Sequence, residues 1–153
     1  KTASLMSAAC CLGTASVTED EELIERMQKF GELAGLSYQI KDDLFDYGTN
    51  KIGKPRGIDI KEKKMTLPLI YALSKCTKSE KRRIITLIKN KSEKTETVRV
   101  VLDFVIKYGG LHYAEKKMIK LKSEALNVLD SFEDSLAKQS LKDLMEWIIE
   151  RKI

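Results

Sequence analysis

Apolar residues recur three and four positions apart between Leu23 and Tyr38, which is the spacing of one packed face of an α-helix. Thr18 and Glu21 precede this run at the spacing of a capping box, and Gly48 follows it where a helix end is expected. These signals predict one long helix from the Thr18 cap to Gly48. The residues that set its period are Leu23, Ile24, Met27, Phe30, Gly31, Ala34, Gly35 and Tyr38.

The rest of the chain also predicts helices, because no alternation of apolar and polar residues extends over five positions. Thr77 and Glu80 form a second capping box, before a helix that runs to about Lys91. Residues 48–63 are rich in glycine and lack a helical period, so they predict a loop. Further helices are expected over residues 1–12 (stopping near Gly13), from 66 onward with Thr66 as the cap, 93–108, 111–129 and 140–151. We therefore expect an all-α helical bundle that forms one domain over residues 1–153.

Charge and cysteine content narrow the class of protein. The net charge of +5 invites an anionic partner, but no aromatic residues interleave with the basic ones and no zinc-ligand spacing occurs, so nucleic acid is not expected. The three cysteines, Cys10, Cys11 and Cys76, make a poor disulfide framework and indicate a reducing, cytoplasmic location. No apolar run reaches the roughly 18 residues of a membrane span. Because the chain starts at Lys1 inside a helical pattern, we expect it to be part of a longer chain.

Three carboxylates gather at the end of the long predicted helix. Asp42 and Asp46 are one turn apart, and Asp43 lies beside them. Like charges repel, and a helix C-terminus is unfavourable for negative charge, so a bound cation would stabilise this arrangement. Helical spacing excludes an EF-hand, whereas Mg²⁺ is commonly held by one or two carboxylates and substrate phosphate oxygens. The alternative is an acidic helix end exposed to water, which the same spacing would produce.

The basic residues that follow favour the metal site over that alternative. Lys51, Lys54, Arg56 and Lys64 come within about twenty residues of the carboxylates. A diphosphate bound through Mg²⁺ still carries negative charge, which lysine side chains would neutralise. Gly53 lies among these residues and would let the backbone turn tightly beside the ligand.

These residues resemble the second aspartate-rich region of trans-isoprenyl diphosphate synthases. The resemblance is strong over residues 1 to about 73, and beyond that only the helical character agrees. It implies an all-helical fold of the isoprenoid synthase type, of which this chain is the C-terminal portion. The matching residues are Lys1-Thr2-Ala3, Phe30-Gly31, Gly35, Gln39, Asp42-Asp43, Asp46-Tyr47, Gly53-Lys54-Pro55, Gly57, Asp59, Lys64 and Thr66-Leu67-Pro68.

The resemblance implies an activity and a role for each matching residue. In the family, an allylic prenyl diphosphate ionises with the help of Mg²⁺, isopentenyl diphosphate attacks the cation, and a proton is lost. Asp42, with Asp43 and Asp46, would hold the metal. The other implied roles are contact with the diphosphate for Lys1, Lys54 and Lys64, and contact with the reacting prenyl carbons for Thr2 and Gln39.

The sequence also departs from the family, because the family's first aspartate-rich motif does not occur in it. We therefore expect the chain to be inactive alone and to form homo-oligomers, since the stripe from Leu23 to Tyr38 and the opening helix would lack packing partners. The Gly53-Lys54-Pro55 loop and the segment from Lys64 to Pro68 resemble the long-chain branch more than the farnesyl branch, which implies an octaprenyl-like product. The alternative function is a non-catalytic helical partner or regulatory subunit of a prenyl synthase.

Overall fold

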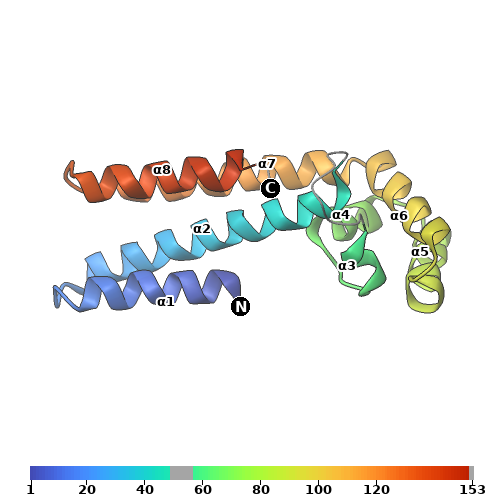
Figure 1. Cartoon of the computed structure of the whole chain (residues 1–153), viewed down its shortest axis with the longest axis horizontal. Helices are drawn as coiled ribbons and strands as arrows, with labels where there is room; N and C mark the ends of the chain where they lie inside the picture. The colour runs from blue at the N-terminus through green and yellow to red at the C-terminus, as the bar shows by residue number, and fades with distance from the viewer. Residues whose placement is uncertain (49–56, 152–153) are drawn as a thin grey trace. The chain divides into compact units, whose positions relative to one another are not determined.

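The computed structural model describes residues 1–48 and 57–151, and every regular element in these ranges is an α-helix. This confirms the predicted all-α class. In chain order the helices are α1 (Thr2–Ala15), α2 (Glu21–Tyr47), α3 (Ile58–Lys61), α4 (Leu67–Lys75), α5 (Lys78–Lys91), α6 (Thr95–Lys107), α7 (Gly110–Asp130) and α8 (Leu136–Glu150) (Figure 1). None of these helices is long and apolar enough to cross a bilayer.

The chain divides into two compact units. Unit 1 comprises Lys1–Lys41 and Lys117–Ile153, and unit 2 comprises Asp42–Lys116. The long helices α2 and α7 each contribute to both units. The prediction of a single domain over residues 1–153 stays a prediction.

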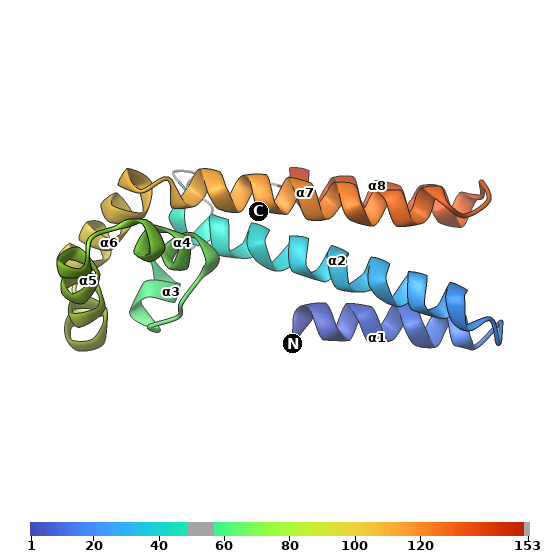
Figure 2. The ribbon, with the colours of Figure 1, turned by 180° about the vertical axis from the view of Figure 1, so that it is seen from behind.

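Unit 1 is built from α1, the first part of α2, the last part of α7, and α8. In Figures 1 and 2, α1 lies beside α2, and ion pairs from Lys122 to Glu146 and from Lys142 to Asp130 join α7 to α8. The buried apolar side chains come from α2, α7 and α8, and none comes from α1. They are Phe30, Leu33, Ala34, Ile40, Met118, Leu121, Ala125, Leu129, Met145 and Ile148.

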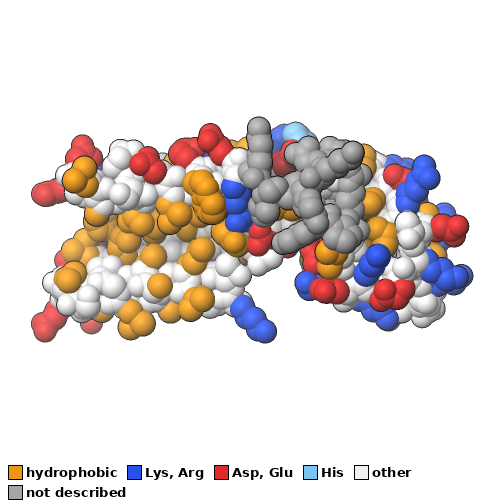
Figure 3. Space-filling model, in the orientation of Figure 1, with side chains coloured by type: hydrophobic (Ala, Val, Ile, Leu, Met, Phe, Trp, Pro, Cys, Tyr) orange, Lys and Arg blue, Asp and Glu red, His pale blue; other side chains and the backbone are white. Residues whose placement is uncertain are grey.

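Burial in unit 1 differs from the expectation for its apolar stripe. Phe30 and Ala34 were expected to lack packing partners, yet both are buried. Helix α1 is exposed, as expected for the opening helix, with Leu5 72% and Leu12 70% accessible. Figure 3 shows the resulting orange band of apolar side chains over this part of the molecule. The exposed apolar surface of unit 1 therefore includes α1 and also α8, where Leu144 and Trp147 are accessible.

Unit 2 packs α3, α4, α5 and α6 around one apolar cluster. Its buried members are Tyr47, Ile60, Leu69, Ala72, Leu73, Ile84, Ile88, Val98, Val101, Phe104 and Val105. Gly57 precedes α3 in the left-handed region (φ 73°), and a Cβ there would lie 2.2 Å from Cγ1 of Val98. Only glycine satisfies both the backbone and the packing at this position. This close approach brings the start of α3 against α6.

Several helix ends differ from the predictions. Thr18 does not cap α2; its Oγ1 accepts from the Asp20 amide, and Asp20 Oδ1 accepts from the amides of Glu22 and Leu23. Asp20 is the better cap because it directly precedes the first helical residue, Glu21. Other differences are that α1 passes through Gly13 to Ala15, that α3 forms inside the predicted loop, and that α8 begins at Leu136 rather than Ser140, after a Ser135 cap.

Other boundaries agree with the sequence. The capping box of Thr77 and Glu80 is present before α5, which ends at Lys91 as predicted. Pro68 lies in the first turn of α4, and α2 ends at Tyr47, directly before Gly48. Gly109 separates α6 from α7 in the left-handed region, with φ 70°.

Candidate functional site

Asp46 holds the beginning of α3 with both of its carboxylate oxygens. Oδ1 accepts a hydrogen bond from the Ile58 amide at 2.8 Å, and Oδ2 accepts one from the Asp59 amide at 3.2 Å. Burial, and then the nearby charge of Asp59, raise the pKa of Asp46, while these backbone hydrogen bonds oppose the rise. The carboxylate therefore has a structural role that the sequence did not reveal. A carboxylate offers about four lone-pair sites, so these two bonds leave room for a cation.

Asp43 and Tyr47 connect the same part of α2 to the start of α4. Asp43 Oδ2 accepts a long hydrogen bond, 3.5 Å, from the Leu67 amide. The hydroxyls of Tyr47 and Thr66 are 2.5 Å apart, so Thr66 bonds across to α2 instead of capping its own helix as predicted. Burial raises the pKa of Tyr47, which keeps the phenol neutral. Two of the three clustered aspartates thus receive backbone N–H groups from following helices, which offsets part of their mutual repulsion.

Asp42, Asp43 and Asp46 are all half-buried on α2. Within residues 1–48 and 57–151, no three His, Cys, Asp or Glu side chains approach closely enough to form a metal site by themselves. Mg²⁺ does not need such a cage, because one or two carboxylates and substrate oxygens are sufficient ligands. The all-oxygen donors fit a hard divalent cation. A bound cation would oppose the burial and the Asp59 charge that raise the pKa of Asp46.

Lys64 forms ion pairs with two acidic side chains near the end of α3. Its Nζ is 3.0 Å from Asp59 and 2.6 Å from Glu62, and these contacts raise the pKa of the lysine. The sequence did not predict either pair. Lys64 follows Lys63, whose φ of 59° is unusual for a residue other than glycine. Lys54, the other lysine expected from this region, lies outside the described residues.

In unit 1, the structure brings Thr2 together with Gln39, two of the predicted site residues. Thr2 Oγ1 donates to Gln39 Oε1 at 3.2 Å. The reason is the close approach of α1 to α2: a Cβ on Gly35 would lie 2.5 Å from Cα of Ala3, and one on Gly31 would lie 2.5 Å from the Met6 carbonyl oxygen. Lys1 is exposed at the N-cap of α1.

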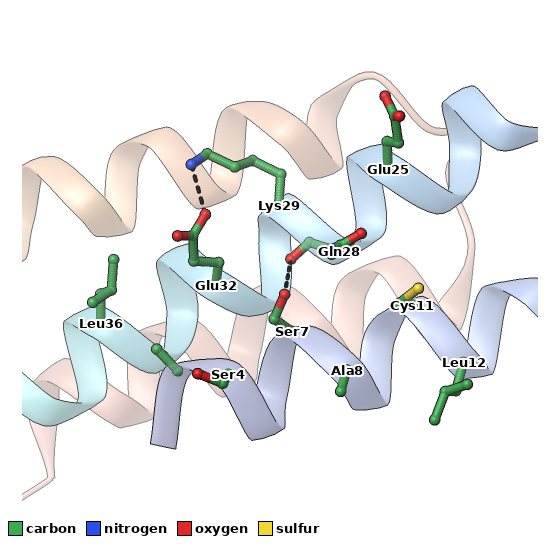
Figure 4. Close-up of a pocket in the computed structure, with 11 residues that line it drawn as sticks. Ser4, Ser7, Ala8, Cys11, Leu12, Glu25, Gln28, Lys29, Glu32 and Leu36 are labelled. Carbon is green, nitrogen blue, oxygen red and sulfur yellow. Dashed lines mark hydrogen bonds and ion pairs between the residues drawn. The ribbon is translucent and has the colours of Figure 1, made fainter. Parts of the chain in front are cut away.

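A groove of about 790 Å³ lies between α1 and α2 in unit 1 (Figure 4). Ser7 donates to the Gln28 carbonyl across it, and Lys29 pairs with Glu32 at its edge. None of the predicted site residues lines this groove. Its small floor residues, such as Ser4 and Ala8, reflect the close helix packing rather than a set of converging polar groups.

The part of the chain that carries the predicted site residues also matches a known protein family. The sequence profile of polyprenyl synthetases matches residues 1–105. This range includes α1, α2 and every residue of the predicted site. The chain belongs to the polyprenyl synthetase family.

Two curated members of the polyprenyl synthetase family illustrate the likeness. The chain is 30% identical, over 99% of its length, to the short chain isoprenyl diphosphate synthase of Methanothermobacter thermautotrophicus, of which it covers 47%. It is also 30% identical, over 99% of its length, to heptaprenyl diphosphate synthase component 2 of Geobacillus stearothermophilus, again covering 47%. The chain therefore spans about half the length of these polyprenyl synthetases.

A solved polyprenyl synthetase structure confirms the isoprenoid synthase fold. Geranylgeranyl pyrophosphate synthase from Corynebacterium glutamicum, complexed with calcium and isoprenyl diphosphate, superposes with a TM-score of 0.83 at 31% identity. The match covers 98% of this chain and 47% of that structure. That enzyme was therefore solved with a divalent cation and a prenyl diphosphate together.

Proposed function

We propose that this chain forms the metal- and diphosphate-binding part of a polyprenyl diphosphate synthase. The carboxylate cluster of α2, held in place by α3 and α4, carries the proposal. It combines oxygen donors for a hard cation with a nearby lysine, Lys64, in a chain that belongs to the polyprenyl synthetase family. Family membership supports the reaction class, and the cluster supports the contribution that we assign to this chain.

Mg²⁺ is the cation that we assign to Asp42, Asp43 and Asp46. When bound, it supplies positive charge to the diphosphate leaving group. Asp42, Asp43 and Asp46 would together hold the ion, although Asp46 and Asp43 already accept hydrogen bonds from the Ile58, Asp59 and Leu67 amides. The two hydrogen bonds from α3 fix the orientation of the Asp46 carboxylate. We expect this carboxylate to be positioned for the metal before substrate binds.

The basic and polar residues have complementary roles in this proposal. Lys1, Lys54 and Lys64 bind the diphosphate oxygens; Lys64 would then exchange its present ion pairs with Asp59 and Glu62 for the ligand. Thr2 and Gln39, already hydrogen-bonded to each other, line the space beside the reacting prenyl carbons.

The reaction we propose is head-to-tail condensation of an allylic prenyl diphosphate with isopentenyl diphosphate. The allylic C–O bond breaks, diphosphate leaves, a new C–C bond forms to isopentenyl diphosphate, and a proton is lost. The metal ion and the lysine side chains would stabilise the negative charge that develops on the diphosphate leaving group. A long-chain, octaprenyl-like product and inactivity of the chain alone are parts of the same proposal.

Calorimetric binding tests the proposal without requiring turnover. The 153-residue chain is titrated with farnesyl diphosphate and with inorganic pyrophosphate, each with and without Mg²⁺. We expect binding that requires Mg²⁺ and that weakens at least about tenfold in Asp42→Asn, because a charge-assisted contact is worth about 1.5–3 kcal/mol. The matched control is Asp103→Asn, an exposed acid on α6 whose replacement changes the net charge equally.

Binding that is independent of Mg²⁺, or equal in Asp42→Asn and the unaltered chain, contradicts the proposed metal site. If Asp103→Asn weakens diphosphate binding as much as Asp42→Asn does, the loss comes from the change in net charge and not from a metal ligand.

A second candidate is a non-catalytic helical partner or regulatory subunit of a prenyl synthase. The observation that favours it is the exposed apolar surface around α1, which another helical chain would cover. Retained Mg²⁺-dependent diphosphate binding separates the two candidates, since a chain that only packs against another has no use for it.

A further inference from the structure

The basic charge of this protein is concentrated in one segment. Residues 75–107, which include α5 and α6, contain ten Lys and Arg against four Asp and Glu. The other 120 residues contain 18 basic and 19 acidic side chains. The whole excess of positive charge therefore lies on this part of unit 2, where Figure 3 shows several blue side chains.

Helix α5 carries three of its cations on an exposed stripe to one side of its buried face. Ile84 and Ile88 pack in the core of unit 2. Lys78, Arg82 and Lys89 are exposed and fall on one stripe of the helix, because their spacings of four and seven residues are close to whole turns. At 1.5 Å per residue, this stripe is about 16 Å long.

No acidic side chain neutralises that stripe. Glu80 is the single acid on α5 and is already engaged, accepting from the Tyr108 hydroxyl at 2.7 Å and from Lys107 at 3.0 Å, and closing the Thr77 capping box. Among the ion pairs of residues 1–48 and 57–151, none involves the α5 cations Lys78, Lys81, Arg82, Arg83, Lys89 and Lys91.

We propose that α5 is a peripheral docking face for an anionic phospholipid membrane. A straight, convex row of lysine and arginine fits a plane of mobile anionic headgroups, which can gather beneath it without fixed geometry. Binding of nucleic acid strands commonly adds aromatic side chains on which bases stack, and the exposed face of α5 carries none.

A shallow hollow between α5 and α6 adds a small apolar contact to the proposed membrane-docking face. Arg83 of α5 and Val100 of α6 both line a depression of about 190 Å³, which Asp103 and Lys107 also border. Val100 is exposed there between two basic and two acidic side chains, because Glu80 also lines the hollow. The hollow therefore adds a small apolar contact beside the cationic stripe and no net charge. The attachment we assign remains on the surface and does not depend on the proposed catalytic function.

Vesicle co-sedimentation of the 153-residue chain tests the assignment. Vesicles of phosphatidylcholine alone are compared with vesicles containing about one third phosphatidylglycerol, at 0.1 M and 0.5 M NaCl, and sedimentation without vesicles is subtracted. We expect binding to the anionic vesicles that is lost at high salt. The phosphatidylcholine arm measures any adsorption through the apolar surface of unit 1.

The stripe is removed by the triple variant Lys78→Gln, Arg82→Gln and Lys89→Gln. Each cation near an anionic leaflet strengthens binding about fivefold, so the triple variant should bind about a hundredfold more weakly. The matched control, Lys29→Gln, Lys116→Gln and Lys120→Gln, removes three exposed lysines outside α5 and α6 and should change binding by less than about threefold. Thermal melting by circular dichroism checks that both variants fold.

Equal weakening by the two triple variants, or equal binding to neutral and anionic vesicles, overturns the proposal. A third arm titrates a fluorescent 20-nucleotide RNA under the same conditions. Tighter binding to that RNA than to anionic vesicles, sensitive to the α5 variant and not to the control, would assign the face to nucleic acid and also overturn it.

Discussion

Gly57 is the residue whose replacement should most damage unit 2. Gly57→Ala would force a left-handed backbone on a residue with a side chain and press its Cβ against Val98. The first effect costs roughly 1–2 kcal/mol and overpacking typically about 1–3 kcal/mol, so we expect a loss of about 2–5 kcal/mol in the free energy of unfolding. Urea denaturation measures it. Gly13→Ala is the control, because Gly13 is helical with open space around it and alanine should stabilise it by about 0.5–1 kcal/mol.

If Gly57→Ala unfolds at the same urea concentration as the unaltered protein, the close contact of Gly57 with Val98 of α6 is contradicted.

Lys63→Gly provides the opposite test at the residue scale, because Lys63 adopts φ 59° without being glycine. We expect that variant to lose no stability, since relief of the left-handed strain offsets the greater freedom of the unfolded chain.

Helices α1 and α2 depend on two glycines one turn apart. Gly31→Ala and Gly35→Ala would each place a methyl group about 2.5 Å from the α1 backbone, so the helices must separate. We expect each variant to lose about 1–3 kcal/mol of stability. Gly13→Ala again serves as the control, because it adds the same methyl group to α1 without a contact. Unchanged stability in both variants would contradict the close packing that brings Thr2 to Gln39.

The junction of α5 with α6 should make stability depend on pH. Hydrogen bonds to Glu80 from Tyr108 first, and then from Thr77 and Lys107, lower the pKa of this carboxyl to about 2. A lowered folded-state pKa gives stability that is complete above the unfolded value near 4.5 and is lost as pH falls toward 2. The melting temperature of the unaltered protein should therefore exceed that of Glu80→Gln at pH 7, and the difference should shrink between pH 5 and pH 2.

Other acids also titrate in this range, so the comparison rests on the difference between the two proteins. Asp130 and Asp134 have lowered pKa values and act in the same direction, whereas the raised pKa of Asp46 acts in the opposite one. All three are present in both proteins and cancel. A melting difference that stays constant down to pH 2 would show that the Glu80 network contributes nothing.

At the scale of the whole molecule, the exposed apolar surface of α1 should drive self-association. Exposing a large apolar side chain costs roughly 1.5–3 kcal/mol, and pairing of two chains through Leu5 and Leu12 would recover part of that. Light scattering at micromolar concentration should show species heavier than 17.4 kDa. Leu5→Gln with Leu12→Gln should shift the population toward monomer. The matched pair Ile70→Gln with Ile106→Gln, exposed in unit 2, should not.

A single species near 17.4 kDa that binds no hydrophobic dye would contradict the expected association. It would show that unit 1 is stable with this surface in water.

The sequence by itself determined the elements whose signals are local. The period of α2, the capping box before α5, and Gly109 between α6 and α7 depend on neighbours a few residues away, so their patterns were sufficient. The aspartate cluster, its lysines and the family resemblance are likewise legible along the chain. These features gave the all-α class and the candidate site.

Only the tertiary structure decided which of those residues are already engaged. Asp46 holds the start of α3, Thr66 turns from its predicted cap to Tyr47, and Lys64 pairs with Asp59, because contacts between segments distant in sequence compete with local ones. Burial was decided in the same way: Phe30 and α1 are both apolar in sequence, but α7 and α8 are in place to cover only the face of α2. A hydrophobic pattern predicts which face of a helix can be buried. Whether that face is buried depends on another helix packing against it, and only the tertiary structure shows this.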